Sequence, residues 1–175
     1  MWQPVLMING YLISVLGLAM LIPAAVDMLE TGRNWSLFVT SSIVSLFIGL
    51  SLFLGNRTKI EKITLQQGYL LTAVSWVSLT LLATLPFILS DVTPGFADAL
   101  FEAMSGLSTT GATVITDLEV LPDSILLWRS MLNGLGGVGI VIFAVALLPF
   151  LGIGGMQIFQ RENSDLNDKF MPKFN

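Results

Sequence analysis

Four long apolar runs, separated by short polar segments, constrain the fold of this chain more than any other feature. They cover residues 5–29, 35–54, 65–89 and 125–151, and none is shorter than twenty residues. About 20 apolar residues in a helix cross the hydrocarbon core of a bilayer. Backbone polar groups in lipid must be bonded within their own segment, so such runs form helices. The pattern predicts an all-α membrane protein with four transmembrane helices. Residues 5–29 contain Pro23, which predicts a kink in the first helix.

The residue types that the chain lacks exclude several kinds of chemistry. It contains no cysteine and no histidine, which excludes disulfides, thiolate or imidazole metal sites and Ser–His dyads. Charged residues make up 11% of the chain, against roughly 25% in soluble domains. No basic run of the kind that binds nucleic acid is present. Membrane lipid, and not nucleic acid, is therefore the expected environment.

Residues 93–116, between the third and fourth runs, are too short and too polar to form another span. Thr93 and Pro94 predict the N-cap and first residue of a helix that ends at Gly106. Thirteen helical residues rise about 20 Å, little more than half of a ~30 Å hydrocarbon core. We therefore expect a re-entrant half-helix and a pore loop between the third and fourth spans. The alternative is an ordinary connector with a short interfacial helix.

The polar residues after this half-helix predict a cation-binding loop. Irregular backbone at membrane depth survives only where it is buried in protein or lines water. The helix would direct its partly negative C-terminus at the loop, where backbone carbonyls can replace the hydration shell of an ion. Gly111 leaves φ free, so that a carbonyl can point inward. The expected ion-binding residues, through their carbonyls more than their hydroxyls, are Thr109, Thr110, Gly111, Ala112 and Thr113.

Three charged residues near the spans allow both a structural and a functional interpretation. Glu102, in the middle of the half-helix, either attracts ions or holds the helix in place, and the structural role is favoured because a carboxylate at that depth needs a partner. Arg129 is expected to reach the membrane surface or to pair with Glu102 or Asp123. Asp27, near the end of the first run, is expected to lie at the membrane interface without a specific role.

The fourth run contains residues 133–139, Asn-Gly-Leu-Gly-Gly-Val-Gly, which satisfy the pattern GxGxxG. The pattern lies inside an apolar run with no preceding strand, so it does not indicate a dinucleotide site. It favours close helix packing or a flexible point in a pore-lining helix. The glycines at 152–155 are expected to end the span.

The basic residues predict the topology. The loop with Arg57, Lys59 and Lys62 and the tail with Arg161, Lys169 and Lys173 should be cytoplasmic, which places both termini inside and the acidic segment 91–123 outside. Three regions follow: residues 1–62, a transmembrane hairpin with its cytoplasmic loop; residues 63–155, a helix–pore-loop–helix unit; and residues 156–175, a cytoplasmic tail.

Two stretches resemble a known family. FEAMSGLSTTGATV and WRSMLNGLGGVGIVIFAVALLPFLGIGGMQ are similar to the first pore-forming repeat of TrkH-type potassium uptake proteins, in the Trk/Ktr/HKT superfamily. The resemblance implies potassium transport in the bacterial inner membrane, through a filter of four loops in which Gly111 is the filter glycine. It implies no cofactor besides the transported potassium, and a cytosolic nucleotide-binding regulator of TrkA type as a partner. It leaves open channel against symporter, and potassium against sodium.

The resemblance also implies four repeats in one chain, whereas this sequence contains one. We expect either a truncated transporter whose tail is the start of a linker, or a pore completed by other repeats or identical subunits. The alternative function is a non-conducting structural or assembly remnant. An intramembrane enzyme using Ser105 or Ser108 is not expected, since a serine nucleophile needs a base within hydrogen-bond reach.

Overall fold

A computed structural model describes the chain except for residues 1, 31, 33, 59–63, 117 and 148–175. It divides into two units, residues 1–139 and residues 140–175, and the described part of the second is only the end of one helix. The described residues form helices and loops without a strand. Four helical stretches are long and apolar enough to cross a membrane: Gln3–Leu29, Trp35–Gly55, Leu65–Leu89 and Asp123–Ile142. The predicted all-α fold with four spans is confirmed.

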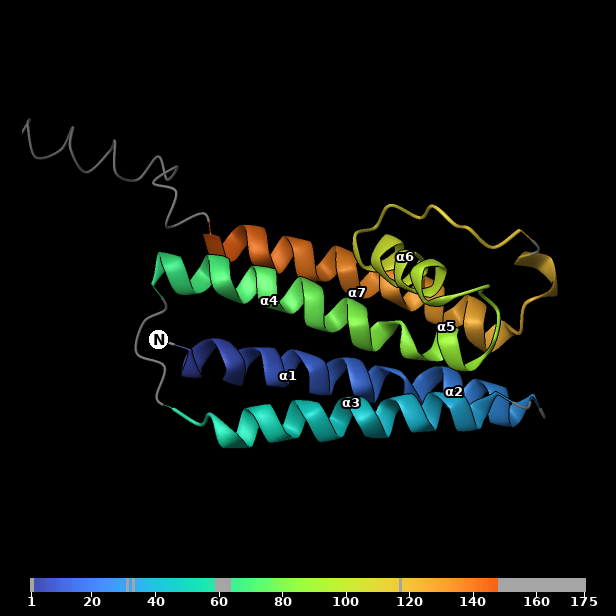
Figure 1. Cartoon of the computed structure of the whole chain (residues 1–175), viewed down its shortest axis with the longest axis horizontal. Helices are drawn as coiled ribbons and strands as arrows, with labels where there is room; N and C mark the ends of the chain where they lie inside the picture. The colour runs from blue at the N-terminus through green and yellow to red at the C-terminus, as the bar shows by residue number, and fades with distance from the viewer. Residues whose placement is uncertain (1, 31, 33, 59–63, 117, 148–175) are drawn as a thin grey trace, which may run out of the picture. The chain divides into compact units, whose positions relative to one another are not determined.

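The amino-terminal hairpin consists of α1 (Gln3–Ala19), α2 (Leu21–Leu29) and α3 (Trp35–Gly55). α1 and α3 lie side by side along their lengths (Figure 1). Small residues bring the two backbones together: a Cβ on Gly10 would lie 2.6 Å from the Phe53 backbone nitrogen. The Ser42 hydroxyl also donates to the Gly17 carbonyl at 2.7 Å. Close approach of this kind holds membrane helices together where lipid offers no hydrophobic driving force.

Prolines interrupt the first and third spans. α1 stops at Ala19, whose carbonyl the ring of Pro23 excludes, and this break confirms the kink predicted there. In the third span α4 (Leu65–Ala83) gives way to α5 (Leu85–Leu89), which contains Pro86. The Phe87 N–H donates to Thr84, leaving the Ala83 carbonyl to accept from the Trp128 indole N–H at 3.2 Å. The break therefore frees a carbonyl that attaches the fourth span to the third.

The second half of the described chain contains α6 (Phe96–Leu107), the 3-10 helix η1 (Leu118–Val120) and α7 (Asp123–Leu147). Its core is centred on Trp128 of α7, which is fully buried. The Trp128 ring meets Phe38 of the hairpin edge to face, with centroids 6.3 Å apart. The hairpin and the helix–loop–helix segment thus share one hydrophobic core.

The predicted start of the half-helix is wrong by two residues. α6 begins at Phe96 with Gly95 as an extended N-cap, and not at Pro94 with Thr93 as the cap. α5 ends at Leu89, and the chain reverses direction between the two helices, with Asp91 at a φ of 53°. This reversal extends to residue 95, so α6 begins later than the sequence predicted. Asp98 does lie in the first turn of α6, where a carboxylate is favoured.

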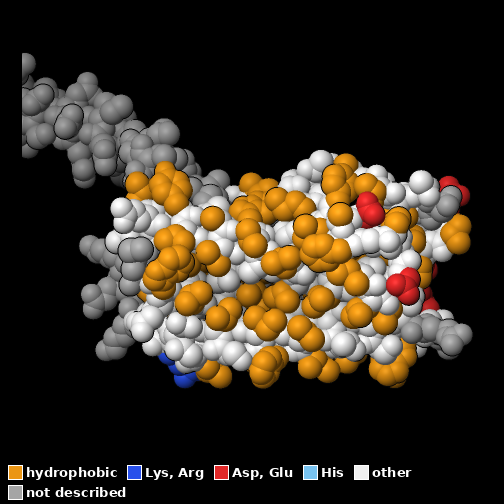
Figure 2. Space-filling model, in the orientation of Figure 1, with side chains coloured by type: hydrophobic (Ala, Val, Ile, Leu, Met, Phe, Trp, Pro, Cys, Tyr) orange, Lys and Arg blue, Asp and Glu red, His pale blue; other side chains and the backbone are white. Residues whose placement is uncertain are grey.

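Charge is divided between the two ends of the spans in the first unit. Figure 2 shows hydrophobic side chains spread over the visible face, acidic side chains towards one end and a small basic area at the other. Asp91 follows α5 and Asp123 begins α7, whereas Arg57 follows α3. Lys59, Lys62, Arg161, Lys169 and Lys173 lie outside the described residues, so the topology stays a prediction.

The contact between α1 and α3 predicts that Gly10→Ala destabilises the hairpin. The added methyl group meets backbone, which cannot rotate away, and overpacking of this kind costs about 1–3 kcal/mol. Thermal unfolding of the purified protein in detergent measures the change. Gly55→Ala is the matched control, because nothing lies within 4 Å of a Cβ at Gly55. Equal midpoints for the two variants would contradict the packing described here.

Candidate functional site

The segment from α6 to η1 enters and leaves at the same end of the first unit (Figure 1). α6 has twelve residues, about 18 Å of rise, and runs in the same direction as α7. Its last residue, Leu107, lies against Gly136, which is near the middle of α7. The chain then returns over α6 as an extended loop. The structure therefore contains the half-helix and reversed loop that the sequence predicted between the third and fourth spans.

A Schellman motif ends α6. The Thr109 N–H donates to the Gly106 carbonyl at 2.9 Å, and the Thr110 N–H donates to the Ser105 carbonyl at 3.0 Å. Thr109 occupies the left-handed position with a φ of 58°, where glycine is the usual residue. A β-branched residue there costs about 1–2 kcal/mol. The sequence does not predict this strain, because nothing local distinguishes Thr109 from Thr110.

Ser105 holds the first part of the loop against the end of the helix. Its carbonyl also accepts from the Gly111 N–H at 3.3 Å, and its hydroxyl donates to the Ala112 carbonyl at 2.6 Å. Gly111 has a φ of 72°, which lies in the left-handed region that favours glycine, as expected of this residue. These three residues, Thr109 to Gly111, are exposed, and among the described residues none donates a hydrogen bond to their carbonyls.

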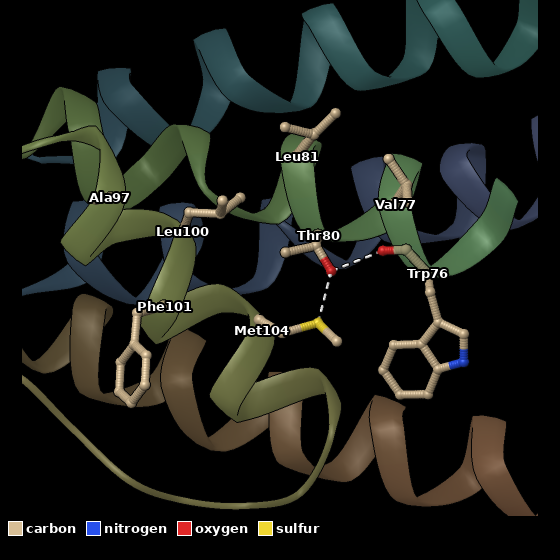
Figure 3. Close-up of a pocket in the computed structure, with 8 residues that line it drawn as sticks. All are labelled: Trp76, Val77, Thr80, Leu81, Ala97, Leu100, Phe101 and Met104. Atoms are coloured by element: carbon tan, nitrogen blue, oxygen red, sulfur yellow. Dashed lines mark hydrogen bonds between the residues drawn. The ribbon is translucent and has the colours of Figure 1, made fainter. Parts of the chain in front are cut away.

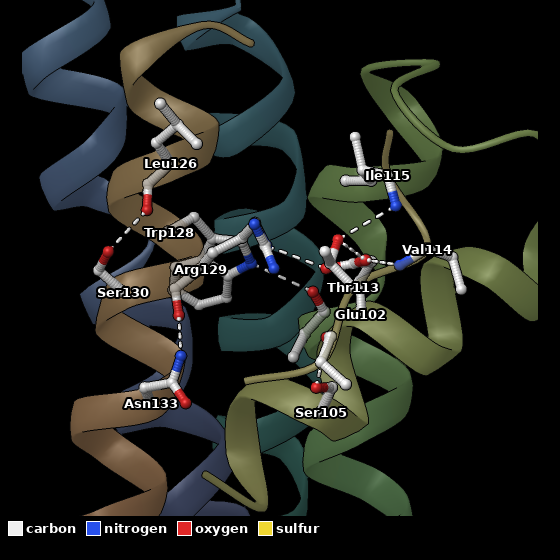
Figure 4. Close-up of polar contacts among 12 residues, drawn as sticks. Glu102, Ser105, Thr113, Val114, Ile115, Leu126, Trp128, Arg129, Ser130 and Asn133 are labelled. Carbon is white, nitrogen blue, oxygen red and sulfur yellow. Dashed lines mark hydrogen bonds and ion pairs between the residues drawn. The ribbon is translucent and has the colours of Figure 1, made fainter. Parts of the chain in front are cut away.

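Glu102 holds the second part of the loop from behind (Figure 4). The residue is 2% exposed, and its Oε1 accepts from the Thr113 hydroxyl at 2.5 Å and the Val114 N–H at 2.8 Å. Its Oε2 lies 2.9 Å from Arg129 Nε of α7, an ion pair by distance, although no aligned hydrogen bond reaches that oxygen. The structural role favoured for Glu102 and its expected pairing with Arg129 are both confirmed.

All five predicted ion-binding residues are exposed, and they follow the C-terminus of α6, where the helix dipole is negative. Two of them are also tied by side-chain hydrogen bonds to α6: the Ala112 carbonyl accepts from the Ser105 hydroxyl, and the Thr113 hydroxyl donates to Glu102. The ties come from residues 7 and 11 positions away, and no sequence pattern predicted them. The structure thus gathers the five residues in one loop, and their role in ion binding stays a prediction.

The glycine-rich stretch of α7 has one glycine that packing requires. A Cβ on Gly136 would coincide with the Leu107 carbonyl oxygen, and a Cβ on Gly106 would lie 2.8 Å from that of Leu132. By contrast, nothing lies within 4 Å of a Cβ at Gly134 or Gly139. The close packing expected of residues 133–139 is confirmed at Gly136. The glycines at 152–155 lie outside the described residues.

An apolar groove of about 490 Å³ lies beside α6, between it and α4 (Figure 3). Its one hydroxyl belongs to Thr80, which donates to the Trp76 carbonyl at 2.7 Å and contacts Met104 Sδ at 3.3 Å. The groove therefore offers no polar group to an ion. Its lining consists of Trp76, Val77, Thr80, Leu81, Ala97, Leu100, Phe101 and Met104.

Fold and loop together define a polytopic membrane protein built around a helix–loop–helix unit. The family model of TrkH, described as a cation transport protein, matches residues 35–174. The chain belongs to this family, as the resemblance indicated.

Several relatives are potassium transport proteins by name. The Trk system potassium uptake protein TrkH of Halomonas elongata is 39% identical over 159 residues, which are 90% of this chain and 33% of that protein. TrkI of the same organism is 36% identical over 98% of this chain and 35% of its own length. The crystal structure of the potassium transporter TrkH from Vibrio parahaemolyticus superimposes with a TM-score of 0.83 at 38% identity, covering 89% of this chain and 33% of that one. The chain thus spans about a third of the length of the relatives it matches.

The Glu102–Arg129 pair predicts that the stability losses on substitution are not additive. Arg129→Met leaves the fully buried Glu102 carboxylate without its counter-charge, and removing one partner of a buried pair costs about 3–5 kcal/mol. Thermal unfolding of Glu102→Gln, Arg129→Met and the double variant measures this. The double variant should lose less stability than the sum of the two single losses. Asp91→Asn, an exposed acid that follows α5, is the control, and additive losses would show that the pair is not coupled.

The contact at the end of α6 predicts that Gly136→Ala destabilises the protein while Gly134→Ala does not. The two substitutions are chemically identical and two positions apart, but only the first places a methyl group on backbone. We expect Gly136→Ala to lower the free energy of unfolding by about 1–3 kcal/mol. Thermal unfolding of the two purified variants in detergent measures the difference. A Gly136→Ala protein as stable as the Gly134→Ala protein would show that α6 does not end against α7 as described.

Proposed function

We propose that this chain contributes one pore-loop unit to a pore that carries potassium across the bacterial inner membrane. The observation that supports this most is the reversed loop, in which the exposed residues Thr109, Thr110 and Gly111 follow the C-terminus of α6. The names of the relatives, which are potassium uptake proteins and a potassium transporter, give the ion.

The loop would act by replacing the water around the ion. Carbonyl oxygens of residues 109–113 take the place of hydration-shell oxygens, and the dipole of α6 favours a cation at the same point. The Ala112 carbonyl, which already accepts from Ser105, keeps a second lone pair. The ties from Ser105 and Glu102 preorganise these groups, so little free energy is spent on ordering them when the ion arrives. The ion then passes along the glycine-rich α7.

One loop does not close a filter, since potassium filters of this kind are rings of four. Other pore repeats or identical subunits would supply the remaining loops. With both termini cytoplasmic, a nucleotide-binding regulator of TrkA type would bind the inner face. The function is transport and not catalysis. The Ser105 hydroxyl, which a serine enzyme would have to deprotonate, donates to a backbone carbonyl.

Radioactive rubidium uptake into liposomes that carry the purified full chain tests the proposal. Gly111→Asp should abolish uptake, because aspartate places a side chain and a fixed charge in the proposed ion path. Gly55→Asp is the matched control: the same change at an open position on the last residue of α3 should leave uptake near the wild-type rate.

The outcomes separate the two candidate functions. Uptake lost only in Gly111→Asp would support a pore formed by copies of this chain. No uptake from any inserted variant would overturn independent transport, and would favour a non-conducting structural or assembly subunit. Repeating the assay with the missing repeats supplied on a second chain then tests the loop as part of a completed pore.

A further inference from the structure

Asp27, expected to lie at the membrane interface without a specific role, is instead buried near the end of α2. The residue is 3% exposed. Its Oδ2 accepts from the Asn34 N–H at 2.7 Å, and its Oδ1 accepts from the Ser124 hydroxyl at 2.8 Å. A Cβ on Gly32 would lie 2.5 Å from the Asp27 Cγ, so the turn between α2 and α3 closes directly over the carboxylate. Both oxygens therefore face donors inside the protein.

The bond from Asp27 to Ser124 joins parts of the chain 97 residues apart. Ser124 is the second residue of α7 and is fully buried. One turn later Trp128 donates to Ala83 and packs on Phe38, and the next residue, Arg129, pairs with Glu102. The first two turns of α7 are thus attached to the hairpin, to the third span and to α6 in succession. A rotation or shift of α7 has to break these attachments together.

We propose that Asp27 is a positioning residue that fixes the register of α7, and through Arg129 and Glu102 the conformation of residues 109–114. A carboxylate suits this position because it only accepts hydrogen bonds, and both of its oxygens meet donors. Removal of the carboxylate would take the acceptor from both the Asn34 N–H and the Ser124 hydroxyl. The amino-terminal hairpin therefore takes part in setting the loop, and does not merely accompany it. The inference rests on the proposed function only where it says that the loop conducts ions.

Hydrogen–deuterium exchange of the purified protein in detergent tests the proposal. The Val114 N–H, which donates to Glu102, and the Thr110 and Gly111 N–H groups, which donate to Ser105, are protected while the loop is closed. Their exchange rates report how often the loop opens, whether or not the protein conducts. We measure these rates in the wild-type protein and in the Asp27→Ala, Ser124→Ala and double variants.

We expect Ser124→Ala to raise these exchange rates about fivefold, the change that one lost hydrogen bond produces in an opening equilibrium. Asp27→Ala should raise them at least as much, because it removes the bonds to Ser124 and to Asn34 together. The double variant should be no faster than Asp27→Ala alone, since the bond to Ser124 is already absent there. Asp91→Asn, an exposed acid that follows α5, is the control and should leave the rates unchanged. Ser124→Ala keeps the test decisive if Asp27→Ala does not fold.

Variants that unfold at lower temperature but keep the wild-type exchange rates would overturn the proposal, because Asp27 would then stabilise only the hairpin. Independent, multiplicative effects of the two substitutions would also overturn it. In an assembly that conducts, Asp27→Ala should in addition lower the ratio of rubidium to sodium flux. An assembly with four loops that shows no flux would contradict the proposed function and leave the exchange test intact.

Discussion

The Glu102 carboxylate, buried between two helices and a loop, is the group on which the arrangement of the site depends. It accepts from Thr113 and Val114 of the loop and pairs with Arg129 of α7. Buried charges are costly unless they are paired, and loop backbone at membrane depth is tolerated only where protein or water satisfies it. The Glu102 side chain meets both requirements, because it pairs with the Arg129 guanidinium and accepts a hydrogen bond from the Val114 N–H of the loop. Ser105 holds residues 110–112 in a similar way: its carbonyl accepts from the N–H groups of residues 110 and 111, and its hydroxyl donates to the carbonyl of residue 112.

Small residues allow this polar network to form. Gly106 and Gly136 let the end of α6 approach the middle of α7 closely enough for Glu102 and Arg129 to meet. Gly10 and Gly49 play the same part between α1 and α3, where each would clash with the other helix if it carried a Cβ. In a bilayer, where apolar surfaces gain little by leaving lipid, such close approach and the hydrogen bonds it permits hold helices together.

Proline breaks connect the spans with one another. The break before Pro86 frees the Ala83 carbonyl for Trp128, and Trp128 in turn packs on Phe38 of the hairpin. Together with the bond between Asp27 and Ser124, this attaches the first two turns of α7 to every other part of the first unit. The helix that lies behind the loop is therefore attached at its start to both the hairpin and the third span.

The sequence by itself determined the number, limits and class of the spans, because hydrophobic length is a local property that the bilayer imposes on each segment separately. It also determined that a half-helix and a glycine-containing loop lie between the third and fourth spans, since both follow from local composition. Only the tertiary structure decided the start of α6, the left-handed Thr109, and the partners of Glu102, Ser105 and Asp27. These depend on contacts between residues as far as 97 positions apart, and a carboxylate in the sequence does not specify which distant donor will reach it.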